Sequence, residues 1–155
     1  KFSLVDKYTE VIYLMYGQPG SGKTTLGELL ANHLMTRHHI DGDHFRKIFH
    51  NSDYSAKGRS HNIKTANAVA TYLAEAYHGA VIMSLVNPYH KLRQELAERV
   101  STVQILLETD RDLRREHHCK DFEVGKPDVV INTDSKEDDT FNLLLSKIGD
   151  YITAS

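Results

Sequence analysis

The sequence has little cysteine and no long apolar run, and each shortage excludes a class of protein. Cys119 is the only cysteine in the 155 residues, which excludes an internal disulfide and favours a reducing compartment. No apolar run approaches the roughly 20 residues that a transmembrane helix needs, so we expect no membrane partner. The first ten residues, KFSLVDKYTE, lack the apolar core and cleavage site of a secretion signal. We therefore expect a cytoplasmic protein.

Basic residues are not in excess either. The chain has 19 Lys and Arg against 21 Asp and Glu, a formal net charge of −2, and so lacks the footprint of a nucleic-acid partner. A hydrophobic content of 40% and a charged content of 26% are ordinary for a soluble globular protein. The chain has no repeats or linkers and is long enough for a real core. We expect residues 1–155 to form a single domain.

Apolar runs alternate with helical patterns along the chain. Continuous apolar runs predict buried strands at 11–16, 80–86, 103–108 and 128–132, with a weaker one at 37–40. Helical spacing predicts helices over 23–34, 59–77, 88–100 and from about 135 onward. This order predicts a three-layer α/β/α fold around a mostly parallel five-stranded sheet. Such sheets bind ligands at the carboxyl ends of their strands.

The motif GQPGSGKT at 17–24 matches the phosphate-binding loop G-x-x-x-x-G-K-[ST]. Lys23 then reaches the β- and γ-phosphates of ATP, and the Thr24 hydroxyl binds Mg²⁺. A glycine turn with a chance lysine is the alternative, but the motif stands between a strand and a helix, as a phosphate loop must. The chain has no N-K-x-D guanine motif and is short for a motor or transporter, which leaves a small P-loop kinase. The ATP-binding candidates are Gly17, Gln18, Pro19, Gly20, Ser21, Gly22, Lys23, Thr24 and Thr25.

The stretch HIDGDHFR at 39–46 places two acids and a cation after the second strand. Phosphoryl transfer needs a held Mg²⁺, cations on the transferring group and a base near the acceptor hydroxyl. Asp41 and Asp43 suit the metal and base roles, and Arg46 suits an anionic acceptor. The alternative is a solvated turn in which Asp43 caps the next helix.

With these motifs the chain resembles the adenylylsulfate kinases, which move the γ-phosphate of ATP to the 3′-hydroxyl of adenosine 5′-phosphosulfate. Beside the phosphate loop, three blocks carry the resemblance. DGDHFR is similar to the family's D-G-D-x-x-R, YSAKGRSHNIK to F-S-x-x-D-R-x-E-N-I-R, and SLVNPYHKLR to S-x-I-S-P-Y-R-x-x-R. The resemblance implies Mg²⁺ and ATP as cofactors, a nucleotide acceptor, a homodimer and a role in sulfate assimilation.

The resemblance also implies roles for individual residues. Asp43 is the base on the acceptor hydroxyl and acts with Lys23 and Asp41, while Tyr54 stacks on the acceptor's adenine. The alternatives are a helix-surface cation for Arg59, a core edge for Tyr54 and a helix opener for Pro88. The implied acceptor-binding residues are Arg46, Tyr54, Arg59, Asn62, Pro88, Tyr89 and Lys120.

The chain departs from the family pattern at several positions. Asn87 stands where many relatives have a serine, so only direct in-line transfer is open to it. Gly58 replaces an aspartate. The lid after residue 108 is shortened, and Phe122 is the one ring in it that is available to replace a missing stacking phenylalanine. The histidines and cysteine at 117–119 favour a structural or lid role over a zinc site. The candidate lid cations are Arg111, Arg114 and Arg115, whose alternative is a solvated, salt-bridged helix face.

Two other functions stay open at the level of sequence. One is a P-loop kinase with another hydroxyl acceptor, such as a nucleotide, a sugar or a polynucleotide 5′-hydroxyl. The phosphate loop also resembles that of polynucleotide 5′-kinases, although the net charge of −2 gives a strand-binding groove no support. The other is an ATP-binding module without catalysis.

Overall fold

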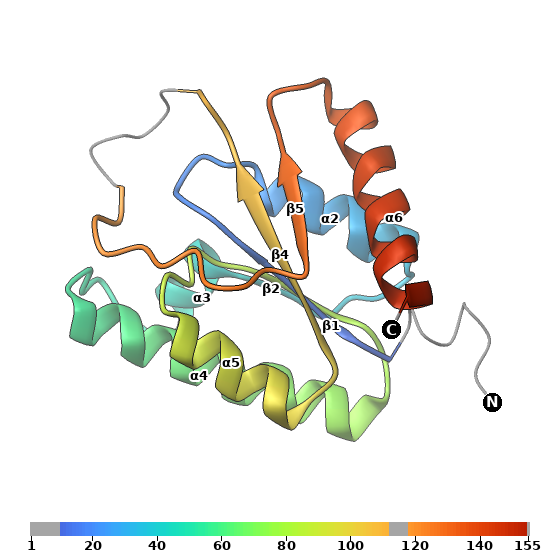
Figure 1. Cartoon of the computed structure of the whole chain (residues 1–155). Helices are drawn as coiled ribbons and strands as arrows, with labels where there is room; N and C mark the ends of the chain where they lie inside the picture. Colours follow the sequence, from blue (N-terminus) through green and yellow to red (C-terminus); the bar gives the residue numbers. More distant parts are fainter. Residues whose placement is uncertain (1–9, 112–117, 155) are drawn as a thin grey trace.

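The computed structural model describes residues 10–111 and 118–154, which form a parallel sheet between two layers of helices (Figure 1). The strands are β1 (Ile12–Tyr16), β2 (His39–Asp41), β3 (Val81–Ser84), β4 (Thr102–Glu108) and β5 (Val129–Asn132). The helices are α2 (Lys23–His33), α3 (Gly42–Ile48), α4 (Ala56–Tyr77), α5 (His90–Arg99) and α6 (Glu137–Ala154). The predicted α/β/α fold is confirmed. The described sheet is parallel in every pair, rather than mostly parallel.

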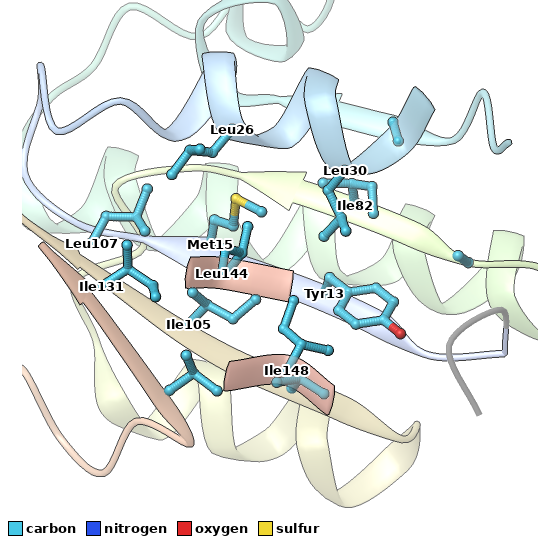
Figure 2. Packing of buried hydrophobic residues seen from close by; sticks show 14 of the residues in the cluster. Tyr13, Met15, Leu26, Leu30, Ile82, Ile105, Leu107, Ile131, Leu144 and Ile148 are labelled. Carbon is cyan, nitrogen blue, oxygen red and sulfur yellow. The ribbon is translucent and has the colours of Figure 1, made fainter. Parts of the chain in front are cut away.

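The two faces of the sheet carry two separate hydrophobic cores, because successive side chains of a strand point to opposite faces. Every residue of β1 is buried, as its continuous apolar run predicted. One face packs against α2 and α6, and Figure 2 shows the residues that meet there: Tyr13, Met15, Leu26, Leu30, Ile82, Ile105, Leu107, Ile131, Leu144 and Ile148. The other face packs against α4 and α5 through Ile12, Leu14, Ala66, Ala70, Val81, Met83 and Leu96.

The helix starts differ from the sequence predictions by a few residues. Helix α4 begins at Ala56, because the Ser55 hydroxyl accepts a hydrogen bond from the Gly58 N–H at 3.2 Å and caps the helix. Helix α5 begins at His90 with Tyr89 as its N-cap. Pro88 therefore lies before the cap and does not open the helix as its first residue.

The strand order β2-β3-β1-β4-β5 brings five loops to one edge of the sheet. The glycine loop follows β1 at the centre of the sheet, with β3 and β2 on one side and β4 and β5 on the other. A crevice outside the carboxyl ends of such strands is the usual ligand site of this architecture. No helix among the described residues combines the length and apolarity needed to cross a membrane.

Candidate active site

The glycine loop has the backbone that phosphate binding needs. Gly20 and Gly22 have φ angles of 84° and 95°, in the left-handed region that residues with a side chain rarely adopt. The N-cap of α2 is Gly22, which has no side chain to accept a hydrogen bond from the first helical N–H groups. Those donors and the positive end of the helix dipole lie where an anion would bind.

Lys23 folds back over this loop. Its side chain is largely buried, and its ammonium donates to the Gln18 carbonyl at 2.8 Å and to the Ser21 hydroxyl at 3.3 Å. The charge is therefore held within the phosphate loop itself. Ser21 is buried at the base of the loop, where its carbonyl accepts from the Thr133 hydroxyl at 2.8 Å.

The ends of β2 and α2 bring a hydroxyl and a carboxylate together. The Thr24 hydroxyl donates to Asp41 Oδ1 at 2.5 Å, and Asp41 Oδ2 accepts from the His44 N–H at 3.2 Å. Asp41, and not Asp43, is thus the N-cap of α3, so the alternative in which Asp43 caps this helix is wrong. Asp43 lies exposed in the first turn of α3 and lines the same cavity as Asp41.

A buried hydrogen-bond chain fixes β2 and β3 against α2. His39 Nε2 lies 2.8 Å from the Ser84 hydroxyl, which donates to the Lys23 carbonyl at 3.1 Å. Because Ser84 donates to that carbonyl, His39 donates to Ser84 through its Nε2–H. Burial lowers the pKa of His39, which keeps the ring neutral at pH 7.

Two arginines lie against the ring of Tyr54. The guanidinium carbon of Arg46 is 4.0 Å from the ring centroid, and that of Arg59 is 5.6 Å from it. Arg46 Nη1 also donates to the carbonyls of Asn51 and Asp53, and Arg59 Nε donates to the Tyr54 carbonyl at 2.9 Å. Tyr54 is 58% exposed, so it is not the core-edge residue of the alternative interpretation. Loop and helix together hold two cations and an aromatic ring at the site.

A cavity of about 490 Å³ joins these groups. This volume lies in the range of small-molecule sites. It brings together most of the candidates predicted from sequence: Pro19, Gly20, Gly22, Lys23, Thr24, Thr25, Asp41, Asp43, Arg46, Tyr54, Arg59, Asn62, Pro88 and Arg111. Gly17, Gln18, Ser21, Tyr89 and Lys120 do not line it.

Arg111 borders the cavity from the side of β4 and β5. Its Nη2 donates to the Thr133 hydroxyl at 3.0 Å, and its Nε is 3.6 Å from Asp134 Oδ1. The Thr109 hydroxyl donates to Asp134, and this bond lowers the pKa of the Asp134 carboxyl. An ionised Asp134 therefore faces Arg111. The other two lid candidates, Arg114 and Arg115, lie outside the described residues, as does the histidine at 117.

Residues 119–125, which we call the docked segment, pack against the start of the phosphate loop and against α5. The Gln18 carboxamide bonds both main-chain groups of Cys119, at 2.9 Å each. The Tyr89 hydroxyl donates to Asp121 at 2.9 Å, and burial together with this bond raises the pKa of Tyr89 to about 12. Phe122 stacks on the buried Tyr16, with ring centroids 6.0 Å apart. Phe122 is therefore not a second ring in the described cavity.

Sequence reasoning gave no binding role to four cavity residues at and just after the end of β3: Ser84, Leu85, Val86 and Asn87. A signal for them was present, because the carboxyl end of every parallel strand faces the site. It also missed Arg93, which is fully buried and donates to the Asn87 carbonyl at 2.6 Å. Arg93 is the last residue of the block SLVNPYHKLR, and sequence reasoning gave Arg93 itself no role.

The acids and hydroxyl at the cavity suit one particular kind of metal. Across residues 10–111 and 118–154, no three His, Cys, Asp or Glu side chains form a group that could hold a metal ion. Thr24 and Asp41 instead offer two oxygen ligands beside a phosphate loop. Mg²⁺ characteristically binds to one or two protein oxygens and completes its shell with phosphates and water. The donor set fits Mg²⁺ and not a structural zinc.

Comparison with known proteins gives one family match and many matches of fold. Residues 9–123 match the family model described as Adenylylsulphate kinase. No curated protein sequence matches the chain.

Solved structures share the fold at low identity. The APS kinase CysC of Mycobacterium tuberculosis, in complex with AMPPNP and APS, is 17% identical with a TM-score of 0.75 over 88% of this chain and 96% of that one. A gluconokinase from Sinorhizobium meliloti 1021 is 14% identical with a TM-score of 0.68, covering 94% and 95%. The shikimate kinase of Aquifex aeolicus is 20% identical with a TM-score of 0.61, covering 90% and 97%.

Proposed function

Because the chain belongs to the adenylylsulfate kinase family, we propose that it transfers the γ-phosphate of ATP to the 3′-hydroxyl of adenosine 5′-phosphosulfate. The products are ADP and 3′-phosphoadenosine 5′-phosphosulfate. One observation carries the proposal. A single cavity is lined by a phosphate loop, two carboxylates at the end of β2 and the start of α3, and two arginines on an aromatic ring. In our proposal, the ATP site and the site of an acceptor that carries an anionic group and a ring share this cavity.

In this proposal the chain's own residues divide the work. The phosphate loop and Lys23 hold the β- and γ-phosphates, and Thr24 with Asp41 would hold Mg²⁺, which neutralises charge on those phosphates. Asp43 takes the proton of the acceptor 3′-hydroxyl as the new oxygen–phosphorus bond forms. The bond between the γ-phosphorus and the bridging oxygen breaks, and ADP carries away that bond's electron pair.

The acceptor lies on the side of α3 and α4. Arg46 and Arg59 face the phosphosulfate charge, and the adenine stacks on the exposed part of Tyr54. Transfer is direct, since Asn87 has no hydroxyl to carry a phosphoryl group. We also propose that the protein acts in sulfate assimilation and forms a homodimer.

A second acceptor class has an observation in its favour. Lys120 and Phe122, the docked-segment residues that resemble acceptor-binding groups, lie outside the cavity lining, and Phe122 packs on Tyr16. Two of the fold relatives are named as a gluconokinase and a shikimate kinase. A small polyhydroxylated acid is therefore the runner-up acceptor.

The test is product analysis with matched variants. Wild-type protein with Mg-ATP and adenosine 5′-phosphosulfate should give the 3′-phosphorylated product, detected by mass spectrometry. Asp43→Asn should bind ATP normally and lose roughly 10²- to 10⁴-fold in turnover, the range of a lost general base. Lys23→Ala should weaken both binding and turnover. Normal turnover by Asp43→Asn would show that Asp43 is not the base. If the wild-type protein binds ATP but forms no product, adenosine 5′-phosphosulfate is not its acceptor.

A further inference from the structure

Two buried carboxamides in the cavity wall have polar atoms without a hydrogen-bond partner. Asn87 is 1% exposed, and neither its Oδ1 nor its Nδ2 is bonded within the described chain. Asn62 is 6% exposed, and its Oδ1 is unbonded there too. Among the described residues that have such atoms, these two line the cavity and the others do not. Because buried polar atoms are nearly always paired, the missing partner is expected inside the cavity.

Asn87 is held firmly in this wall. Its φ angle of 44° is left-handed, a conformation that asparagine accepts more readily than most residues. Arg93 Nη1 holds its carbonyl at 2.6 Å, and the carbonyl of the preceding Val86 accepts from the Gly17 N–H at 3.3 Å. Val86 and Pro88 on either side also line the cavity. The backbone of Asn87 is therefore fixed between the phosphate loop and α5, and the residue itself lines the cavity.

The chemistry of the unpaired atoms selects the group that they bind. A carboxamide offers one acceptor and two donor hydrogens, so satisfying it takes a partner that also does both. Phosphate and sulfate oxygens that are ionised only accept hydrogen bonds, and the cavity already supplies Lys23, Arg46 and Arg59 for them. A hydroxyl group both donates and accepts. The anionic end of an acceptor thus leaves Asn87 unsatisfied, whereas a hydroxyl-bearing part satisfies it.

We propose that Asn87 is a specificity-determining residue that hydrogen-bonds a hydroxyl of the acceptor other than the one that receives the phosphate. For adenosine 5′-phosphosulfate this hydroxyl is the ribose 2′-hydroxyl, an identification that rests on the proposed function. Asn62 supplies a further acceptor atom to the same part of the substrate.

The experiment compares two acceptors and two proteins. Asn87→Gly removes the carboxamide and keeps a residue that tolerates the left-handed backbone. Wild-type and variant are assayed with adenosine 5′-phosphosulfate and with its 2′-deoxy analogue. We expect Asn87→Gly to lower kcat/KM for the ribose acceptor by roughly tenfold, the scale of one buried hydrogen bond. The KM for ATP should not rise and the melting temperature should not fall, since the removed atoms have no bonded partner in the described structure.

The comparison between acceptors separates recognition from a structural role. Wild type should disfavour the deoxy analogue by a similar factor, while Asn87→Gly should treat both acceptors alike. Asn87→Asp keeps the size of the side chain and an acceptor oxygen but removes the amide donor, so it should lose only part of the preference for the ribose acceptor. Asn142→Asp, the same change at an exposed site on α6, should keep the full preference. The proposal would be overturned if Asn87→Gly had the kcat/KM of wild type for the ribose acceptor, or if it lost kcat/KM equally with both acceptors.

Failure of the proposed function gives a different result. If wild type binds ATP but does not phosphorylate adenosine 5′-phosphosulfate, the same variants are compared on gluconate and shikimate by ADP release. A selective loss in Asn87→Gly for the acceptor that turns over supports the role of Asn87 with another substrate. Equal activity of wild type and Asn87→Gly, or no acceptor turned over by either, overturns it.

Discussion

Gly58 is a residue where the backbone leaves no room for a side chain. A Cβ there would lie 2.3 Å from the Asp53 carbonyl oxygen and 2.3 Å from its Cγ. The turn at 51–55 folds onto this position, with the Asn51 carboxamide donating to the Gly58 carbonyl at 3.0 Å. This turn carries Tyr54, and the absence of a side chain at Gly58 lets the turn pack closely on the first turn of α4.

Gly58→Ala should therefore move Tyr54 and the neighbouring Arg59 out of position. We expect a loss of about 1–3 kcal/mol in the free energy of unfolding, as for other overpacked sites. The KM for the acceptor should rise while ATP affinity stays unchanged. Gly79→Ala is the control, because a Cβ at that position meets nothing closer than 3.9 Å. An acceptor KM equal to that of wild type in Gly58→Ala would contradict this account of the turn.

At the scale of elements, Arg93 connects three parts of the chain. It extends from α5, lies with its guanidinium carbon 4.0 Å from the Tyr16 ring centroid on β1, and donates to the carbonyls of Asn87 and Glu123 at 2.6 Å each. Burial lowers the pKa of Arg93, so the charge is retained at some cost and is balanced by these carbonyl dipoles. The docked segment and the cavity wall therefore share one buried support.

Arg93→Leu should be strongly destabilising. It keeps much of the packing volume but leaves the main-chain carbonyls of Asn87 and Glu123 without the Arg93 donor, while the Val124 carbonyl keeps its bond from the Tyr16 hydroxyl. Each unsatisfied buried group costs about 1–3 kcal/mol, so we expect a loss of at least about 2 kcal/mol, measured by urea unfolding. Lys91→Leu on the exposed face of α5 is the control. Arg93→Lys should recover only part of the loss, since an ammonium lacks the fork that reaches both carbonyls. Wild-type stability in Arg93→Leu would contradict the supporting role.

The elements differ in how well the sequence predicted them. The four long apolar runs correspond to β1, β3, β4 and β5. Burial on both faces produces the continuous apolar signal of β1, β3 and β4, whereas burial alternates along β5 at the end of the strand order. The phosphate loop was predicted because its residue types follow directly from its chemistry. The docked segment was not predicted. It is held by side-chain bonds to main-chain groups about a hundred positions away, such as Gln18 to Cys119, and such bonds leave no periodic pattern.

Helix caps show the same limit at closer range. The sequence offers Asp43 as the cap in the alternative interpretation, although Asp41 is also an N-cap residue type at the start of the same helix. The structure makes Asp41 the cap and leaves Asp43 in the first turn, because β2 extends as far as Asp41. Strand length, set by pairing with β3, decided which carboxylate faces which partner.

Over the whole molecule, the site gathers charge that the overall composition conceals. The net charge is −2, yet the cavity lining contains Lys23, Arg46, Arg59 and Arg111 against two aspartates. Net charge therefore describes the surface as a whole, while the strand order concentrates cations at one edge. A small polyanion is the ligand class that this distribution favours.

The single cysteine allows a test of whether this edge behaves as one unit. Cys119 is 4% exposed, and burial together with its bond to Asp121 raises the pKa of its thiol to about 11. Thiol reagents react with the thiolate, so labelling at pH 8 should be slow and should require opening of the docked segment. That segment is fastened to Gln18 of the phosphate loop through both main-chain groups of Cys119.

Nucleotide binding should therefore protect Cys119 from labelling, although the thiol does not line the cavity. If opening also breaks the phosphate site, Mg-ADP at 100 times its Kd should slow labelling by roughly 100-fold, equivalent to about 2.7 kcal/mol. Gln18→Ala should label faster without nucleotide and lose most of the protection, whereas Gln94→Ala on the exposed face of α5 should match wild type. If Mg-ADP did not change the labelling rate of wild type, the docked segment would open independently of the phosphate loop.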